Sequence, residues 1–540
     1  MKSSEWWHGA VIYEVYLPSF YDSNGDGWGD LRGLLQRLDH IASLGVDAIW
    51  ITPFYPSPME DFGYDVAAFR EVDKRFGNLD DFDGVVASAH ALGIKVIIDQ
   101  VWAHTSSAHS WFQESASGPA SEKADWYVWA NPRPDGGPPN NWLSVFGGSA
   151  WQWHPVRRQY YLHHFLASQP KLNLHNEQVL NAHFSNAEFW LARGVDGFRL
   201  DAIDFMLHDE SLRDNPANPH RPEPTPWNPF RFQRHLHDMC QPANHELVTD
   251  LRRFIDRFPE VITIGELSSE TGALGRVAAM TGKTKLHMAY TLGVMKTAFA
   301  PSILRQVIED AAIRNRADGL CWSFSNHDVE RVVSRWNSHG ARRADFALLQ
   351  MAMLLTLPGS ACLYQGEELG LPQARLPLSA IRDPFGRTFY PAYAGRDGAR
   401  TPLPWVAGAP NSGFSTAART WLPLDCEHDR LAADRQEEDP DSTLAGYRRM
   451  LHWRKAHPAL RTGTVELLGL PDPIVAWRRK QGGERVLAIF NTSDEAVTLS
   501  TAALPAFEPA QELRFVAAAK GGELRLPPFG ICLGTEHSNR

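Results

Sequence analysis

Three acidic side chains each end a short apolar run that is typical of a β-strand. Asp201 ends the run GFRLD, Glu266 ends VITIGE, and Asp328 ends WSFSNHD. Carboxylates that end different strands of a closed parallel barrel converge on one face of it. Two carboxyl groups, one ionised and one protonated, are what the cleavage of a glycosidic bond requires. One acid after a strand is often only a helix N-cap, but three such acids favour a shared site.

The neighbours of two of these acids predict different charge states. Residues i and i+2 of a strand point to the same side, so Arg199 is placed to lower the pKa of Asp201 and keep it ionised as a nucleophile. Glu266 follows Ile, Thr and Val, and partial burial there is expected to raise its pKa and make it a general acid. His327 precedes Asp328 and is a nearby donor. His104 ends another run and is either a donor to a sugar hydroxyl or a histidine satisfied within the core.

Eight strand-like runs alternate with helical patterns, and they predict the scaffold that positions these acids. Strands separated by helices imply parallel pairing with right-handed crossovers. An open doubly wound sheet is the competing architecture, but the count of eight and the spread of polar strand ends favour an α/β fold of the (β/α)8 TIM-barrel class. The predicted strands are residues 10–16, 47–52, 95–101, 197–201, 261–266, 286–290, 322–328 and 361–365, and the predicted helices include residues 31–44, 79–92, 179–193, 245–258 and 342–355.

Two intervals lack this alternation of strand-like and helical runs, and a third region has a different pattern. Residues 105–169 are rich in Trp, Gly, Pro and Asn, too long for a simple loop, and predict an inserted domain after strand three. Residues 371–440 are irregular and are expected to cover the same barrel face. After about residue 458, short β-rich runs predict a C-terminal antiparallel β domain. The predicted domains are therefore a barrel (1–104 and 170–457), the insertion (105–169), the irregular stretch (371–440) and the C-terminal domain (458–540).

Composition narrows the class of protein. The chain has 540 residues, 43% hydrophobic residues and a net charge of -10, which fits a globular protein and argues against a nucleic-acid surface. Its 19 Trp residues suit sugar stacking, although filling a large core is the simpler interpretation. The five cysteines form no C-x-x-C pair, which suits a reducing compartment. No secretory signal or membrane-spanning run is present, so a cytoplasmic protein without membrane or nucleic-acid partners is predicted.

These residues together resemble glycoside hydrolase family 13, the α-amylase family, in its α-glucosidase and oligo-1,6-glucosidase branch. The runs QPKLN at residues 169–173 and GRDGARTP at residues 395–402 also look like motifs of that branch. The resemblance extends from about Trp6 to the C-terminus, with the motifs in family order. It implies a retaining, exo-acting α-glucosidase that can also transfer glucose, acting on small-molecule α-glucosides as a monomer or homodimer.

The resemblance also implies roles for individual residues. Asp201 matches the nucleophile, Glu266 the general acid/base and Asp328 the transition-state stabiliser. Asp61 and Tyr64 match residues that hold the non-reducing-end glucose, and Arg396 matches an arginine that pairs with that aspartate. The remaining predicted substrate-binding residues are the hydroxyl donors His104, Arg199 and His327 and the aromatic walls Phe146 and Phe165.

One loop predicts a metal site. Residues 22–30, DSNGDGWGD, place Asp and Asn at alternate positions with Gly at the sixth, an oxygen-rich tight loop of the kind that hard cations require. It departs from an EF-hand because Gly33 stands where the bidentate Glu belongs, and a solvated polar turn is the alternative. The resemblance implies one structural divalent cation, Ca²⁺ or Mg²⁺, with the ligands Asp22, Asn24, Asp26, Asp30 and the backbone carbonyl of Trp28. Ala103 stands where most of the family has an Asn linked to a second calcium site, which is therefore not expected.

Specificity rests on one small residue. Ala202 follows the nucleophile, and in the branch that the chain resembles, small residues there accompany α-1,4 activity and Val accompanies α-1,6 activity. Ala202 therefore indicates maltose-like substrates, unless it merely packs behind the site. The alternatives are a sucrose-active isomerase or glucosyltransferase on the same scaffold, and a non-catalytic member of the fold, which the presence of all three carboxylates disfavours.

Overall fold

A closed cylinder of parallel strands forms the centre of the molecule. The computed structural model describes residues 5–219, 228–268, 272–313, 319–337, 340 and 342–536. Eight strands pair in the order β10-β11-β1-β2-β3-β7-β8-β9, and every neighbouring pair within that order is parallel. An isolated parallel bridge between Ala289 and Leu320 closes the seam between β9 and β10. The strands are β1 Val11–Val15, β2 Ala48–Ile51, β3 Lys95–Gln100, β7 Gly197–Leu200, β8 Ile262–Leu267, β9 Met288–Thr291, β10 Cys321–Ser323 and β11 Ser360–Tyr364.

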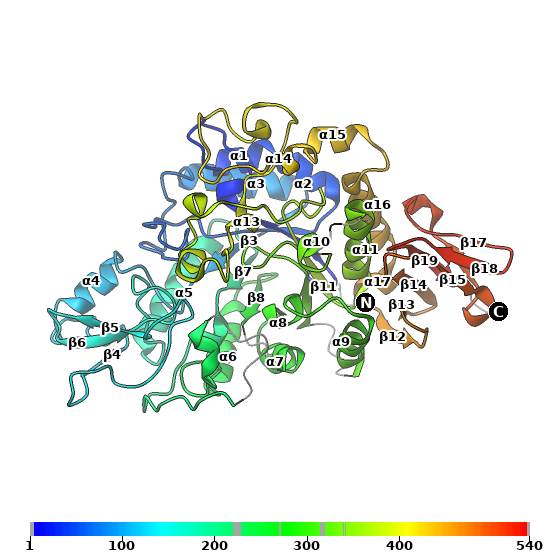
Figure 1. Ribbon diagram of the computed structural model, residues 1–540. Coiled ribbons are helices and arrows are strands. Elements are labelled where there is room, and N and C mark those ends of the chain that lie inside the picture. Colours follow the sequence, from blue (N-terminus) through cyan, green and yellow to red (C-terminus); the bar gives the residue numbers. More distant parts are fainter. Residues whose placement is uncertain are drawn as a thin grey trace.

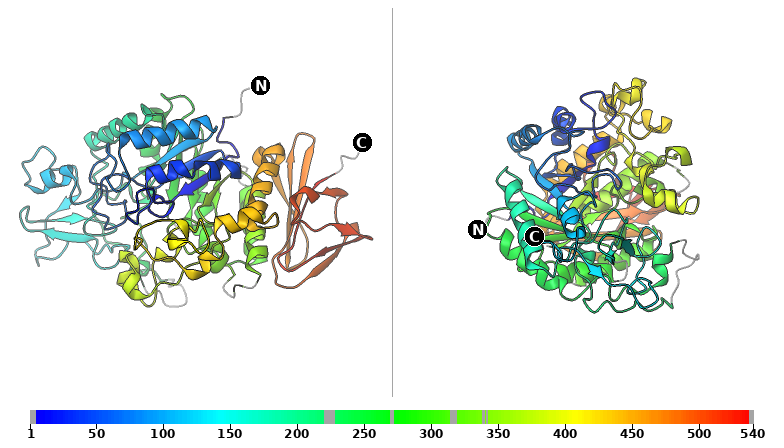
Figure 2. Two further views of the ribbon diagram at one scale, coloured as in Figure 1. Left: turned by 90° about the horizontal axis from the view of Figure 1, so that it is seen from above. Right: turned by 90° about the vertical axis from the view of Figure 1, so that its left-hand side faces the viewer.

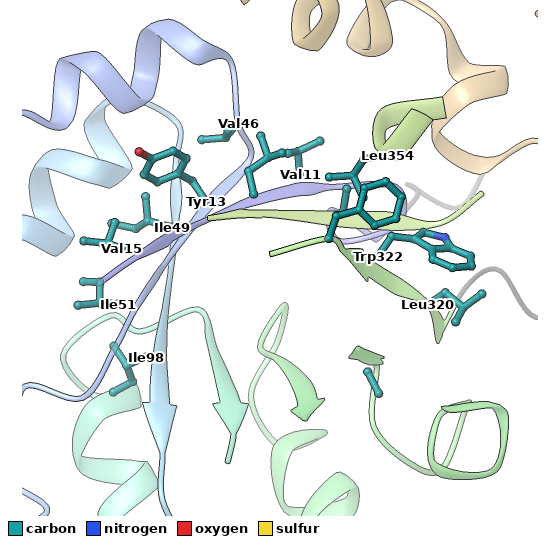
Figure 3. Packing of buried hydrophobic residues seen from close by; sticks show 14 of the residues in the cluster. Val11, Tyr13, Val15, Val46, Ile49, Ile51, Ile98, Leu320, Trp322 and Leu354 are labelled. Atoms are coloured by element: carbon teal, nitrogen blue, oxygen red, sulfur yellow. The ribbon is translucent and has the colours of Figure 1, made fainter. Parts of the chain in front are cut away.

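Alternate residues of each strand enter two separate hydrophobic layers, as the two-residue period of a strand requires. Val11, Tyr13 and Val15 of β1 point outward and belong to the large core between the strands and the helices, part of which Figure 3 shows. Ile12 of the same strand points inward and packs with Trp50 and other residues that fill the barrel interior. This alternation confirms the strand predictions, with boundaries shifted by one or two residues except in β10. That strand ends at Ser323, so Asp328 lies in the loop after it and not at the end of the predicted strand 322–328.

The inward positions change character along the barrel. Where the strands begin, they are apolar or small, as Ile12 and Gly197 are. A Cβ at Gly197 would lie only 2.7 Å from the side chain of Ile262, so this layer is tightly packed. Toward the strand ends, the inward positions carry Glu14, Asp99, Arg199, Glu266 and similar polar groups, all buried. The polar groups therefore lie at the carboxyl end of the barrel, where such folds place their sites.

Helices surround the strands (Figure 1). The predicted helix over residues 31–44 is instead two helices, α1 and α2, which meet at Arg37. The guanidinium of Arg37 lies 4.4 Å from the ring centre of Tyr21 and 4.7 Å from that of Trp405, so the chain is anchored at the break. The main helices are α1 Leu31–Gln36, α2 Leu38–Leu44, α3 Leu79–Ala91, α5 Glu177–Leu191, α6 Asn244–Ile255, α7 Ala273–Met280, α9 Pro301–Ile313, α11 Arg343–Thr356, α16 Thr443–Ala456 and α17 Pro458–Thr462.

Smaller sheets lie at the two ends of the molecule (Figure 2). One is antiparallel and falls within residues 105–169, where the short helix α4 (Ser110–Ala116) also lies although no helix was predicted there. Its strands are β4 Trp129–Ala130, β5 Trp151–His154 and β6 Gln159–Leu162. The other end carries two antiparallel sheets. The first contains β12 Thr464–Leu468, β13 Ile474–Gln481, β14 Glu484–Asn491, β16 Phe507–Pro509 and β19 Ile531–Glu536. The second contains β15 Val497–Ser500, β17 Ala519–Lys520 and β18 Glu523–Leu526.

The fold is thus an α/β barrel of eight parallel strands with antiparallel β-structure inserted after β3 and added at the C-terminal end. Within the described ranges, no helix is both long enough and apolar enough to span a bilayer.

Candidate active site

Arg199 lies at the centre of the buried polar groups. Its side chain is fully buried, and Nη1 donates to Asp99 Oδ1 at 2.8 Å and to Asp201 Oδ1 at 2.7 Å. Nη2 lies 2.9 Å from Glu266 Oε2, and both Nε and Nη2 donate to the hydroxyl of Tyr290. The i, i+2 pairing of Arg199 with Asp201 that the strand pattern predicted is present. One guanidinium therefore joins three strand-end carboxylates.

Asp99 links this centre to the loop after β2. Its Oδ2 accepts hydrogen bonds from the Tyr64 hydroxyl at 2.9 Å and from Trp50 Nε1 at 3.2 Å. The Trp50 ring also lies beneath Arg199, 4.8 Å from the guanidinium carbon. Asp99 thus orients Arg199 and Tyr64 without facing the open side of the site itself.

The residue after Asp201 positions Glu266. Ala202 has a left-handed backbone, with φ 45° and ψ 48°, which non-glycine residues seldom adopt. In this conformation its backbone N–H donates to Glu266 Oε2 at 3.1 Å. The loop that carries Asp201 therefore fixes the second carboxyl group as well, and such strained backbone is typical of functional sites.

The pKa of Asp201 differs from the expectation. Burial raises it to about 7, although Arg199 acts in the opposite direction. Asp99 and Asp328 add repulsion that the sequence pattern did not include. Burial also raises the pKa of Glu266 to about 7, in the predicted direction. Close carboxyl groups of this kind titrate as a pair and can share a proton.

A second ionic cluster surrounds Asp328. Its Oδ1 accepts from Arg400 Nη2 at 2.6 Å and from Arg396 Nη1 at 3.1 Å. Arg396 also donates to Asp61 Oδ1 at 2.6 Å and to Asp383 Oδ1 at 2.8 Å. The predicted pairing of Arg396 with Asp61 is therefore present, and it joins the loop after β2 to the irregular stretch 371–440.

Asp328 remains ionised and is the most accessible of the three acids. Burial alone would raise its pKa, but the guanidiniums of Arg396 and Arg400, which donate to it, hold that pKa far below the usual range. Its side chain is 23% exposed, compared with 10% for Asp201 and 5% for Glu266. A fixed negative charge therefore lies at the open side of the cluster.

His104 is a buried, neutral histidine beside Tyr64 and Gln169. Burial lowers its pKa to about 4, so the ring is neutral. Its Nε2 lies 3.0 Å from the carbonyl oxygen of Tyr64 and 3.3 Å from the side-chain amide nitrogen of Gln169. Nδ1 has no hydrogen-bond partner among the described residues. Gln169 joins this group by donating to Asp61 Oδ2 at 3.0 Å.

The two predicted aromatic walls, Phe146 and Phe165, lie next to each other, with ring centres 5.9 Å apart. Phe146 has the Arg396 guanidinium carbon 5.2 Å from its ring centre and stacks on Phe385 at 5.0 Å. Phe165 lies 5.2 Å from the ring of His104 and 5.2 Å from that of Phe205. Aromatic rings thus border both the arginine cluster and the histidine.

The loop of residues 22–30 is organised by its own backbone. Asp22 accepts N–H groups from Asn24, Gly25 and Gly27, and Gly25 and Gly27 have positive φ angles of 79° and 93°. Asp30 caps α1 by accepting from the Gly33 N–H at 2.6 Å. In the part of the chain that the structure describes, no three His, Cys, Asp or Glu side chains are grouped as a metal site. A cation here would therefore need amide and carbonyl oxygens as well as carboxylates.

Several residues of the site were not predicted from the sequence. An acid inside an otherwise apolar buried strand was the available signal for Glu14. Asp99 lies at the end of a strand, as Asp201 and Glu266 do. The full group is Glu14, Asp99, Tyr290, Asp383 and Arg400.

Comparison with known proteins places this geometry in context. The family model for the α-amylase catalytic domain matches residues 14–463. A probable α-glucosidase of Rhizobium meliloti (strain 1021) is 47% identical over 532 residues, covering 97% of this chain and 96% of the relative. The crystal structure of the α-glucosyl transfer enzyme XgtA aligns with a TM-score of 0.94 at 46% identity, covering 99% and 100% of the two chains. The trehalulose synthase MutB of Pseudomonas mesoacidophila MX-45 aligns with a TM-score of 0.87 at 29% identity, covering 99% and 100%.

Proposed function

The chain belongs to glycoside hydrolase family 13, the α-amylase family, and from this premise we propose that it is a retaining, exo-acting α-glucosidase. Its substrates are small sugars, and the proposed ones are maltose, short α-1,4-linked oligosaccharides and aryl or alkyl α-glucosides. The observation that carries the proposal is the contact of Asp201 and Glu266 with the two terminal nitrogens of one guanidinium, Arg199. Neighbouring carboxyl groups support retention, because retaining enzymes hold them about 5 Å apart and inverting enzymes hold them farther apart.

The two carboxyl groups have complementary roles. Asp201, which accepts a direct hydrogen bond from Arg199, carries the negative charge and attacks the anomeric carbon. Glu266 carries the shared proton and gives it to the departing glycosidic oxygen, so that a covalent glucosyl ester forms on Asp201 as the bond to the aglycone breaks. Glu266 then takes a proton from water, which attacks the same carbon and releases Asp201. Two inversions give net retention.

The ionic cluster at Asp328 supports cleavage from the non-reducing end. Asp61 and Arg396 form an ion pair at 2.6 Å across two loops, and Asp383 fixes Arg396 from behind. A pair that joins loops over a barrel end limits how far a sugar chain extends past it, so one terminal glucose occupies the pocket. Asp328, always ionised, stabilises the positive charge that develops at the anomeric carbon.

Transfer of glucose to other acceptors follows from the same intermediate. An alcohol or a second sugar that replaces water yields a new α-glucoside. The similarity to the α-glucosyl transfer enzyme XgtA supports this part of the proposal. The small side chain of Ala202, next to Asp201, supports an α-1,4 preference.

Proton NMR of the first turnovers tests the proposal. With maltose or an aryl α-glucoside, α-glucose should appear before mutarotation, and transfer products should appear at high maltose or with added alcohol. Initial β-glucose would overturn the assignment of Asp201 and Glu266.

A sucrose-active isomerase is the second candidate, because the trehalulose synthase MutB has a similar fold. Incubation with maltose, isomaltose and sucrose separates the two: isomerised sucrose as the main product would replace the α-glucosidase proposal.

The loop of residues 22–30 supports a further proposal, one structural Ca²⁺ or Mg²⁺. Asp22, Asn24, Asp26 and Asp30 would supply side-chain oxygens and Trp28 its carbonyl, a set that suits a hard cation. The loop contacts a distant segment, since the Asp22 N–H donates to the Phe414 carbonyl at 3.1 Å and a Cβ at Gly27 would lie 2.4 Å from the Arg419 carbonyl oxygen. An ion there would stiffen the junction of the two segments.

A further inference from the structure

Glu14 is a buried acid that the proposed reaction does not use. It points into the barrel from the middle of β1 and is fully buried. Its Oε1 contacts Nδ1 of His327 and also accepts the His327 backbone N–H at 3.4 Å. Its Oε2 has no partner within the described ranges. Among the described residues, the side chain that is hydrogen-bonded to Glu14 is therefore that of His327, which adjoins Asp328.

The ring of His327 is held in one orientation. Tyr64 stacks on one of its faces, with ring centres 5.2 Å apart and 9° between planes, and Tyr16 stacks at 5.6 Å and 17°. With Nδ1 directed to Glu14, Nε2 points the other way, 3.6 Å from Asp328 Oδ1 and without a hydrogen-bond partner among the described residues. Nε2 is therefore the ring atom available to a bound sugar.

The proton between Glu14 and His327 decides what Nε2 can do. A neutral imidazole has one donor and one acceptor nitrogen. If Glu14 were ionised beside a neutral ring, Nδ1 would donate to it and Nε2 would face the Asp328 carboxylate as a second acceptor. If Glu14 carries the proton, its hydroxyl donates to Nδ1, and Nε2–H faces Asp328 and the sugar. The second arrangement pairs donors with acceptors throughout.

The surroundings favour the neutral pair. Burial raises the pKa of Glu14 well above its usual range, with Asp328 and Asp99 adding to the effect and Arg199 opposing it. Burial likewise lowers the pKa of His327 well below its usual range; Arg400, Arg199 and Arg396 act in the same direction, whereas Asp328 acts against them. A proton on the carboxyl group rather than on the ring is consistent with both shifts.

We propose that Glu14 is a positioning residue that donates its carboxylic proton to Nδ1 of His327 and so holds His327 as the Nε2–H tautomer, which donates to a hydroxyl of the bound glucosyl unit. The inference rests on the proposed function for the identity of that sugar. The tautomer itself does not depend on any activity.

Two substitutions at Glu14 separate the hypotheses. Glu14→Gln keeps a donor to Nδ1 and should retain kcat/KM within about threefold of the wild type. Glu14→Leu removes the donor and should lower kcat/KM roughly 10²-fold, mostly through kcat, as the loss of an oriented transition-state donor does. Tyr13→Phe is the matched control: it removes the buried hydrogen bond to Glu368 from the outward face of the same strand and should lower the melting temperature without changing kcat/KM.

Nitrogen-15 NMR of histidine-labelled protein reads the tautomer directly. The His327 signals, identified by their loss in His327→Asn, should be those of a neutral Nε2–H ring in the wild type and in Glu14→Gln. An Nδ1–H ring or an imidazolium in the wild type would overturn the inference, as would a folded Glu14→Gln as impaired as Glu14→Leu. If Glu14→Leu does not fold, the wild-type spectrum and the spectrum and kcat/KM of Glu14→Gln still test the inference. If the wild type gives the spectrum of the Nε2–H ring but has no glucosidase activity, the proposed function is wrong and the inference about the tautomer still holds.

Discussion

Two cations are buried on either side of the loop that carries Asp201, and they are stabilised differently. Arg199 contacts the carboxylates of Asp99, Asp201 and Glu266. Lys171 lies just after the inserted segment of residues 105–169, and its Nζ donates to the backbone carbonyls of Phe205 and Met206 at 2.7 and 2.8 Å. No carboxylate pairs with it among the residues that the structure describes.

The side chains of Arg199 and Lys171 are equally buried, so the difference in their charge states comes from their hydrogen-bonding partners. Burial alone would lower the pKa of Arg199, but Asp99 and Glu266 raise it well above its usual range. Burial lowers the pKa of Lys171 to about 7. The nearby rings of His104, His164 and His208 are themselves neutral through burial, so they add no positive charge beside Lys171. The active-site cation is therefore permanent, whereas the cation at the junction titrates near neutral pH.

The largest expected effect comes from removing one carboxylate of the Arg199 group. Asp201→Asn should reduce hydrolysis of an aryl α-glucoside by about 10⁴-fold or more, since the nucleophile is lost. Arg199 keeps Asp99 and Glu266, so the melting temperature should change little. Asp209→Asn, which alters a carboxylate paired with Arg213 at the surface, is the control. Wild-type-like turnover in Asp201→Asn would refute the assignment.

Removing the paired cation itself is expected to affect both activity and stability. Arg199→Met leaves three carboxylates without their common partner, and breaking a buried ion pair from one side costs about 3–5 kcal/mol. Activity should fall roughly 10²–10³-fold, because Asp201 and Glu266 lose their orientation. Thermal unfolding and initial rates measure the two effects. A variant as stable as the wild type would mean that the carboxylates are protonated together and that Arg199 is dispensable to the fold.

Lys171→Met should show a smaller effect that depends on pH. The pKa of Lys171 is about 7 in the folded state and near 10.4 in the unfolded chain. Between these values the unfolded state binds more protons, so stability rises with pH. The burial cost of the charge is therefore greatest below about pH 7 and is relieved as pH increases. The melting temperature of the wild type relative to Lys171→Met should rise from pH 6 to pH 9.

The same pH series with Lys74→Met, at an exposed lysine, should give a plot of melting temperature against pH that is parallel to that of the wild type. If the plot of melting temperature against pH for Lys171→Met is also parallel to that of the wild type, Lys171 keeps one charge state from pH 6 to pH 9. The contrast with Arg199 would then be wrong.

A removable cation gives the smallest expected effect. Chelation should lower the melting temperature by a few degrees, and added Ca²⁺ or Mg²⁺ should restore it, because a ligand that binds only the native state stabilises it. Asp26→Ala should abolish the response to chelator. If metal analysis of the purified protein finds no divalent ion, the loop of residues 22–30 is a polar turn.

Sequence patterns predicted what depends on near neighbours along the chain. The alternation of apolar residues located the eight strands, and the ends of these strands located Asp201 and Glu266. Asp328 lies in the loop after β10, five residues beyond the end of that strand. The spacing of Arg199 and Asp201 predicted their contact. It could not predict the pKa of Asp201, because that depends on Asp99 and Asp328, which come from other parts of the chain.

Patterns of near neighbours in the sequence could not predict contacts between residues that come from distant parts of the chain. Glu14 meets His327 across 313 residues of sequence, and Asp61 meets Arg396 across 335. The second pairing was expected only because the motifs resembled a known family, and the first had no such support. His104 contacts the backbone carbonyl of Tyr64, a partner that no side-chain pattern encodes.

The seam of the barrel has a dynamic consequence. Between β9 and β10 a single bridge, Ala289 to Leu320, replaces the continuous ladders found elsewhere around the cylinder in the described part of the chain. Fewer ladder hydrogen bonds mean a lower free energy for local opening, so amide protons along β9 should exchange with solvent sooner than those of β2 or β3. Tyr290 lies on β9 and bonds to Arg199 at 2.6 Å. Breathing of this seam would therefore loosen the guanidinium that holds the two reacting acids.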